Sequence, residues 1–172
     1  VITQDPTRRP AGNCRPFFWP NMPSMCSARP LFTVPLRAKS VREQWRNPRK
    51  IFAVDQGFKS VVDYGGDEGR GRVLENIVFL ELRRRSKDIY YHADLQETDF
   101  VFYAAKEPEL FNVCFDLGNA DTRRREVTGM RAAMKHFKVR NGHIITADHE
   151  EIIREGRDTI TVVPAGKWLL GK

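Results

Sequence analysis

Prolines are distributed unevenly along this chain of 172 residues, and their distribution limits where regular structure can form. Eight of the ten prolines lie in the first 48 residues. Because proline lacks a backbone N–H group and fixes φ, it interrupts helices and central strands. Residues 1–30 also lack apolar periodicity, so we expect an irregular arm over 1–30 and one folded domain over 31–172.

The positive charge of the chain is concentrated in the same N-terminal part. Residues 1–50 contain 10 Lys and Arg against 2 Asp and Glu, a balance of +8, whereas residues 51–172 contain 19 against 20, a balance of −1. A basic segment predicts an acidic partner such as nucleic acid, with Arg8, Arg9 and Arg15 as contacts. The aromatic residues 17–19 could dock on the domain or on another protein chain. The change of composition near Met25 suggests a truncated or out-of-frame leader.

Cysteine content and hydropathy indicate the cellular compartment. The three cysteines cannot all pair within one chain, and none has a spacing typical of a zinc site. No apolar run approaches the ~18 residues that a membrane span needs. We therefore expect a cytoplasmic protein in a reducing compartment, without a membrane partner.

The apolar pattern from residue 51 onward predicts a succession of helices and strands. Apolar residues cover most of the circumference of a helix over 69–85, and Val127, Met130, Met134 and Phe137 form a stripe at 3, 4, 3 spacing on a second helix. Asn119 is the expected N-cap of that second helix. Asn141 and Gly142 are typical of a turn. The predicted helices span 69–85 and 120–138, and the predicted strands span 51–54, 89–92, 99–103, 110–115, 143–146 and 159–163.

Acidic residues on the first helix and the second strand of this succession could hold a divalent cation. Glu75 precedes Val78 and Phe79 by three and four residues, so its carboxylate lies beside an apolar stripe and needs a partner, a metal or water. Glu97 and Asp99 share one side of an extended strand. A solvent-exposed helix residue and ordinary turn chemistry explain these acids about equally well.

Two further positions lie on the predicted strand 110–115. Asn112 and Cys114 share one face, and Asn112 interrupts an apolar run, so its amide must find hydrogen-bond partners. A bond to a neighbouring loop would satisfy that need as well. The four histidines are scattered, which argues against a histidine metal centre.

Other patterns exclude or weaken further classes of site. The glycine-rich segment 65–71 leads into a helix but lacks the Lys-Ser/Thr of a phosphate loop, so we expect no ATP site in this chain. Arg83, Arg84 and Arg85 lie in the last turn of the predicted helix, where cations favour the negative end of the helix dipole. Contact with nucleic acid is the alternative role of these three arginines.

Several blocks, taken in order, resemble a known family: the C-terminal domain of unknown function of archaeal and bacterial AAA+ ATPases. The resemblance covers residues 31–170. Its blocks are NPRKIFAVDQG at 47–57, GRVLENIVFLEL at 71–82, ETDFV at 97–101, NVCFDL at 112–117, IITAD at 144–148 and VPAGKWLL at 163–170.

This resemblance implies an α/β fold, with a three-layer α/β/α restriction-endonuclease-like core in the order αβββαβ around a central mixed sheet. By this resemblance, Glu75 and Asp99 correspond to the acids of a PD-(D/E)XK nuclease. Asn112 and Cys114 correspond to the two residues of its E-x-K pair. Glu75, Glu97 and Asp99 are then the candidate ligands of Mg²⁺ or Mn²⁺. An amide at 112 and a thiol at 114 replace the usual carboxylate and ammonium.

The departures from the E-x-K pair favour a catalytically degenerate domain that binds nucleic acid or a partner protein, without magnesium-dependent cleavage. The alternative is an active nuclease acting on DNA or RNA, in which a migrated cation such as Lys106 or Lys135 replaces the missing lysine. A structural remnant of a larger ATPase is the third reading. Fold alone does not choose among them.

Overall fold

The computed structural model of the chain describes residues 31–38, 40–55, 57, 67–93 and 96–171. The arm predicted over residues 1–30, with its arginine contacts and its aromatic residues 17–19, lies outside the described residues, as does the first part of the glycine-rich segment. Among the described residues, none of the helices combines the length and the apolar composition needed to cross a bilayer.

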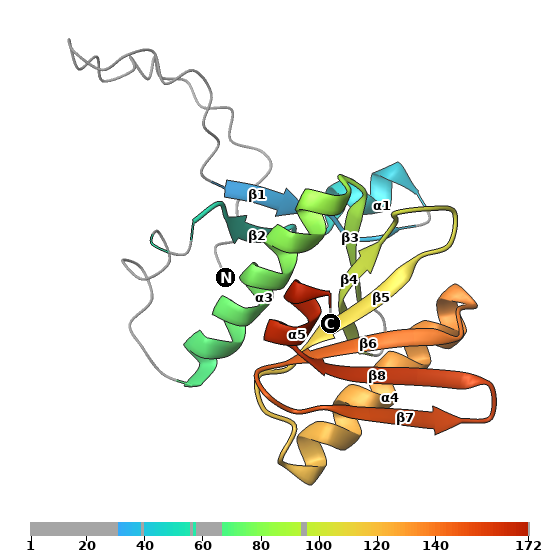
Figure 1. Cartoon of the computed structure of the whole chain (residues 1–172). Helices are drawn as coiled ribbons and strands as arrows, with labels where there is room; N and C mark the ends of the chain where they lie inside the picture. Colours follow the sequence, from blue (N-terminus) through green and yellow to red (C-terminus); the bar gives the residue numbers. More distant parts are fainter. Residues whose placement is uncertain (1–30, 39, 56, 58–66, 94–95, 172) are drawn as a thin grey trace, which may run out of the picture.

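A six-stranded mixed sheet in the order β3-β4-β5-β6-β8-β7 forms the centre of the fold (Figure 1). Strands β3, β4 and β5 form an antiparallel meander, β6 pairs in parallel with β5 and β8, and β7 pairs antiparallel with β8. This confirms the predicted mixed sheet and its meander. The strands are β3 (Ile89–Ala93), β4 (Glu97–Phe102), β5 (Glu109–Val113), β6 (Asn141–Thr146), β7 (Glu151–Glu155) and β8 (Asp158–Pro164).

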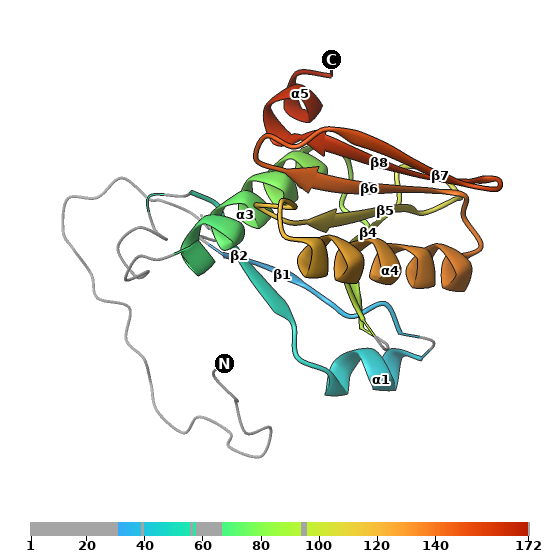
Figure 2. The ribbon, with the colours of Figure 1, turned by 90° about the horizontal axis from the view of Figure 1, so that it is seen from below.

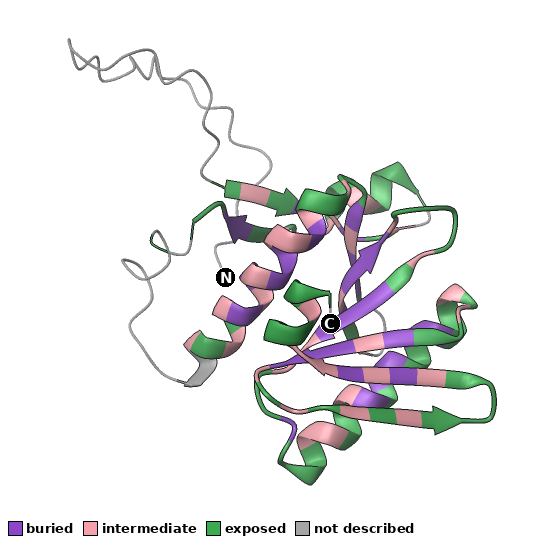
Figure 3. Cartoon of the chain, viewed as in Figure 1, coloured by how far each residue is buried: buried purple, intermediate pink, exposed green. Residues whose placement is uncertain are grey.

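Two long helices cover opposite faces of this sheet, as their apolar stripes predicted. Helix α3 (Asp67–Arg85) lies on one face beside the short helix α5 (Ala165–Leu170), and α4 (Ala120–Phe137) lies on the other (Figure 2). Successive side chains of β4 point to opposite faces of the sheet. Phe100 packs with the α3 side and Val101 with the α4 side. Because both faces are covered, buried residues gather along the central strands β4, β5 and β6 (Figure 3).

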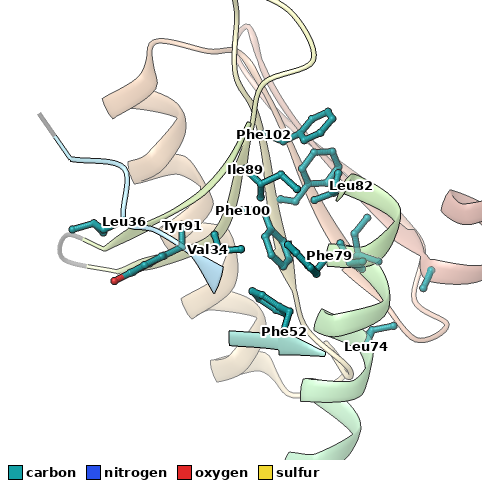
Figure 4. Close-up of a cluster of buried hydrophobic side chains, with 14 residues drawn as sticks. Val34, Leu36, Phe52, Leu74, Phe79, Leu82, Ile89, Tyr91, Phe100 and Phe102 are labelled. Atoms are coloured by element: carbon teal, nitrogen blue, oxygen red, sulfur yellow. The ribbon is translucent and has the colours of Figure 1, made fainter. Parts of the chain in front are cut away.

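Aromatic side chains fill the core on the α3 side (Figure 4). The rings of Phe52 and Phe79 stack with centroids 4.3 Å apart, and Phe100 lies 5.5 Å from Phe52. Full burial of such a side chain stabilises the fold by roughly 1.5–3 kcal/mol. Phe52 belongs to a small separate sheet, so this aromatic packing attaches that sheet to α3.

The small sheet consists of β1 (Leu31–Val34) and β2 (Lys50–Ala53), which pair antiparallel. Helix α1 (Val41–Arg46) lies between them in sequence, and its N-cap Ser40 accepts a hydrogen bond from the Glu43 amide. Sequence analysis predicted β2 but neither β1 nor α1. Both missed elements are short and lie between prolines, which end them before a periodic pattern can develop.

Helix α4 begins at its predicted cap, because the Asn119 side chain accepts hydrogen bonds from the amides of Asp121 and Thr122. The prediction of a turn at Asn141 and Gly142 is wrong. Both residues belong to β6, where they pair with Thr159 and Ile160 of β8. The chain reverses instead at Lys138, whose φ of 58° places it in the left-handed region at the end of α4.

Candidate functional site

A lysine and three carboxylates meet where β2, α3 and β4 come together. The Nζ atom of Lys50 lies 2.9 Å from Glu75 Oε1, 2.6 Å from Glu97 Oε1 and 2.8 Å from Asp99 Oδ1. Sequence analysis named the three acids, and the structure brings all three to one point. It did not name Lys50. We refer to these four residues as the acid–lysine cluster.

The charges in the acid–lysine cluster depend on one another. Burial disfavours the charged form of Lys50, but Asp99 and Glu75 outweigh burial and raise the pKa of its ammonium group above the ordinary value. Burial and the charge of Asp99 raise the pKa of Glu75, although Lys50 offsets part of this shift. The ammonium therefore stays charged at neutral pH, while Glu75 is easier to protonate than an ordinary glutamate.

A buried asparagine holds β2 against α3 and so sets the positions of Lys50 and Glu75. The amide of Ala53 donates to Asn76 Oδ1 at 2.8 Å, and Asn76 Nδ2 donates to the Ala53 carbonyl at 3.0 Å. Asn76 follows Glu75 directly on α3. On the other side of the acid–lysine cluster, the Tyr91 hydroxyl of β3 donates to the Pro48 carbonyl at 2.6 Å. These bonds hold β2 to α3 at its last residue and to β3 just before its first residue.

Asp99 ends the pairing between β4 and β5. The ladder runs as far as Phe100 and Phe111, and beyond it Asp99 Oδ2 accepts a hydrogen bond from the Val113 amide at 2.8 Å. A side chain thus occupies the place of a backbone carbonyl, and the two strands separate. A cavity of about 350 Å³ lies at this separation, lined by Gln96, Glu97, Asp99, Asn112, Val113, Arg125 and Glu126.

The two positions predicted as degenerate lie on the α4 side of β5. Asn112 is buried and donates from Nδ2 to Glu126 Oε2 at 3.1 Å. The Cys114 thiol donates to the Asp116 carbonyl at 3.2 Å. Burial and the charge of Glu126 raise the pKa of this thiol to about 11. Cys114 therefore provides neither a cation nor a thiolate at neutral pH.

The other basic residues that were predicted to have a role lie outside the acid–lysine cluster. Lys106 is exposed in the link between β4 and β5, and Lys135 lines a separate cavity near the end of α4. Neither belongs to the acid–lysine cluster, in which the cation is Lys50. Arg84 and Arg85 bind Glu81, and Arg83 donates to the Lys87 carbonyl. These bonds fit the predicted role of the three arginines at the helix end.

Lys50 and Glu126 are two charged residues of this region that sequence reasoning missed, although each carried a signal. Lys50 precedes the buried Phe52 by two residues, so it lies on the same side of an extended strand. Glu126 precedes the buried Met130 by four residues and therefore borders the apolar stripe of α4. The same spacing argument had identified Glu75.

Comparisons with known proteins identify a distant relative. Residues of this chain are 31% identical over 132 residues to the uncharacterized protein MJ1544 of Methanocaldococcus jannaschii. The match covers 70% of this chain and 29% of that protein, so the chain spans less than a third of the relative. No family model and no solved structure matches the chain. The resemblance to the AAA+ ATPase-associated family remains a prediction.

Proposed function

We propose that this chain is a divalent-metal-dependent nuclease of the PD-(D/E)XK type, acting on DNA or RNA. The observation that carries the proposal is the convergence of Glu75, Glu97 and Asp99 on Lys50. Lys50 offers, from β2, the ammonium that Cys114 cannot offer from β5. The order α3, β3, β4, β5, α4, β6 also supports the proposal, because it is the αβββαβ order of that nuclease core. Association with an ATPase module belongs to the same proposal.

The residues around the cavity fit a hard divalent cation. Glu97, Asp99 and Glu126 line it with carboxylate oxygens, the ligands that Mg²⁺ and Mn²⁺ prefer. Asn112 Oδ1 is buried and has no hydrogen-bond partner among the described residues, so it is an additional oxygen donor. In the described parts of the chain, no three His, Cys, Asp or Glu side chains form a ready-made metal site. Cation binding therefore requires the carboxylates to shift relative to Lys50.

Each residue of the acid–lysine cluster has a role in phosphodiester hydrolysis under this proposal. A divalent cation would supply charge stabilisation at the phosphoryl oxygens and a lower pKa for the attacking water. The Lys50 ammonium binds a non-bridging phosphate oxygen and stabilises the charge that develops there. Glu75 accepts the proton of the water as its oxygen bonds to phosphorus, because its raised pKa favours protonation. The P–O bond to the departing nucleotide breaks, and solvent protonates that oxygen.

A binding module without cleavage is the second candidate function. The observation that favours it is the complete pairing of Lys50, whose ammonium lies within 2.9 Å of three carboxylates and so already neutralises part of their charge. In such a module Lys50 would take the place of the metal ion. The chain would then bind nucleic acid or a protein without hydrolysing it, as Asn112 and Cys114 suggested at the level of sequence.

A nuclease assay separates the two functions. With Mg²⁺ or Mn²⁺, we expect the full chain to cleave single- or double-stranded DNA or RNA and the Asp99→Ala variant to show no cleavage. Loss of the ammonium in Lys50→Met should lower the rate about 100- to 1000-fold, by comparison with removal of one oxyanion donor. Lys106→Met, which changes an exposed lysine, serves as the matched control. Absence of cleavage by the native chain on all four substrates would favour the binding module.

A further inference from the structure

Asn112 occupies the position at which the proposed nuclease core would normally carry a carboxylate. Its side chain lies 2% exposed between β5 and α4. One end of the amide is satisfied, because Nδ2 donates to Glu126 Oε2 at 3.1 Å. The other end is not, because Oδ1 is buried and no residue in the part of the chain that the structure describes donates to it. A buried amide oxygen without a partner is unfavourable unless a water or a cation satisfies it.

Glu126 brings a carboxylate from α4 to this same point. Its side chain is 16% exposed and lines the cavity together with Glu97 and Asp99. Glu126 Oε2 accepts from Asn112, and Oε1 accepts from Arg125 Nη2 at 3.1 Å and Nε at 3.3 Å. Arg125 is 67% exposed, so its guanidinium can turn into solvent when another cation approaches.

We propose that Glu126 supplies, from α4, the metal-binding carboxylate that residue 112 lacks, and that Asn112 is the residue that positions it. The cavity would hold Mg²⁺ or Mn²⁺ through Asp99, Glu126 and Asn112 Oδ1. This inference rests on the proposed nuclease function. It assigns the third acid of the site to a helix instead of a strand, and it explains why an amide is compatible with position 112.

The charge of the cavity supports this assignment. Its lining includes three carboxylates, Glu97, Asp99 and Glu126, against one guanidinium, and the balance stays negative when the Lys50 ammonium beside Glu97 and Asp99 is counted, so the lining attracts a cation. A carboxylate at 112 would instead lie directly against Glu126, and two adjacent carboxylates resist joint ionisation. Under this proposal, a carboxylate at either position 112 or position 126 completes the cation site. One carboxylate at these two positions is enough.

Calorimetric titration of the full chain with Mn²⁺ tests the inference without relying on activity. We expect binding by the native chain, binding at least tenfold weaker in Glu126→Gln, and binding roughly 10- to 100-fold weaker in Asn112→Ala, which removes both the amide that positions Glu126 and one oxygen donor. Glu107→Gln, which changes an exposed acid in the β4–β5 link, should bind as the native chain does. Circular dichroism establishes that each variant is folded.

A charge relocation gives the sharper test. The double variant Asn112→Glu with Glu126→Gln moves the carboxylate from α4 to β5, and it should recover Mn²⁺ affinity to within about threefold of the native chain. Native affinity in Glu126→Gln, together with loss of binding in Asp99→Asn, would overturn the inference and leave the proposed function intact. Glu126-dependent Mn²⁺ binding without nuclease activity would support the cation site and refute the nuclease. Absence of Mn²⁺ binding by the native chain would overturn both.

Discussion

At the scale of single residues, Lys50 determines the electrostatics of the site. It is the shared counter-charge of three carboxylates, and two of these, Glu75 and Asp99, have side chains only 23% and 20% exposed. Carboxylates that are partly removed from water depend on such a partner, because their desolvation is otherwise uncompensated. Removal of Lys50 should therefore affect folding stability as well as the proposed nuclease activity.

Replacement of Lys50 by methionine should destabilise the chain in a pH-dependent way. Because the pKa of Lys50 is raised above 10.5, its ammonium stabilises the fold at every pH below that value. Because the pKa of Glu75 is raised above 4.5, the native chain loses stability as pH rises through the raised value. In Lys50→Met the loss of stability with rising pH becomes larger, because Lys50 no longer offsets the upward shift of the Glu75 pKa. We expect Lys50→Met to cost roughly 3 kcal/mol at pH 8 and less at pH 5, where Glu75 can protonate.

Urea unfolding at pH 5 and pH 8 measures this difference. Lys106→Met is again the control, because that lysine is exposed. Equal losses of stability at the two pH values in Lys50→Met would show that the variant disturbs packing and not charge.

The candidate site was predictable from sequence in part. Glu75, Glu97 and Asp99 were identified because helical and strand spacing places each beside apolar residues or beside one another. Lys50 was not, because its partners Glu75 and Asp99 lie 25 and 49 residues away, and periodicity describes only local neighbours. The lysine beside the three acids is Lys50, whereas Lys106 and Lys135, which were predicted as alternative cations, lie elsewhere.

At the scale of secondary-structure elements, β6 and α4 pack closely through Gly142. A Cβ atom added at Gly142 would meet the side chains of Met130 and Met134 at distances below ordinary contact. Both methionines are buried, which limits their movement. Sequence analysis interpreted Gly142 as a turn residue, because Asn-Gly favours turns locally. The packing of α4 on β6, which is a tertiary contact, is the reason for glycine here.

The variant Gly142→Ala should lower the free energy of unfolding by about 1–3 kcal/mol through overpacking. Thermal unfolding followed by circular dichroism checks this. Gly166→Ala is the matched control, because a Cβ there meets no atom of the described residues within 4 Å on an exposed face of α5. That control should be neutral or slightly stabilising, since alanine favours helix. An unchanged stability in Gly142→Ala would mean that the methionines rearrange without cost.

The long periodic elements were the predictable ones. Both long helices and the meander appear at the expected positions, with shifts of two residues or fewer at the helix ends. Strand β7 was missed because its sequence, EIIRE, has adjacent apolar residues flanked by charged ones and no apolar alternation, and it lies at the sheet edge, where Ile152 remains 57% exposed. Its hairpin signal was Gly156, whose φ of 60° suits the turn into β8.

At the scale of the whole molecule, charge is divided between the N-terminal part and the rest. The first 50 residues have a balance of +8 and the remaining residues a balance of −1. Phosphate contacts dominate non-specific nucleic-acid binding. If the chain binds nucleic acid, most of the affinity should therefore come from the N-terminal segment, as its sequence predicted.

Replacing Arg8, Arg9 and Arg15 together by glutamine should reduce the slope of log K against log salt concentration by up to about 2.7 for duplex DNA. The matched variant replaces Arg83, Arg84 and Arg85, and it should leave the slope unchanged, because Glu81 and a backbone carbonyl already bind these arginines. Fluorescence anisotropy over a range of salt concentrations gives both slopes. A reduced slope in the second variant alone would assign the contact to α3.

The contacts of Lys50 also have a consequence for how the chain reaches its native state. Each contact closes a loop of 25 or more residues, and such long-range closure is entropically costly and slow compared with helix formation. The amine is an ordinary solvent-accessible nucleophile in the unfolded chain and is largely enclosed once β2 docks on α3. A pulse of acylating reagent during refolding therefore measures when the small sheet docks, because Lys50 reacts before docking and is protected afterwards.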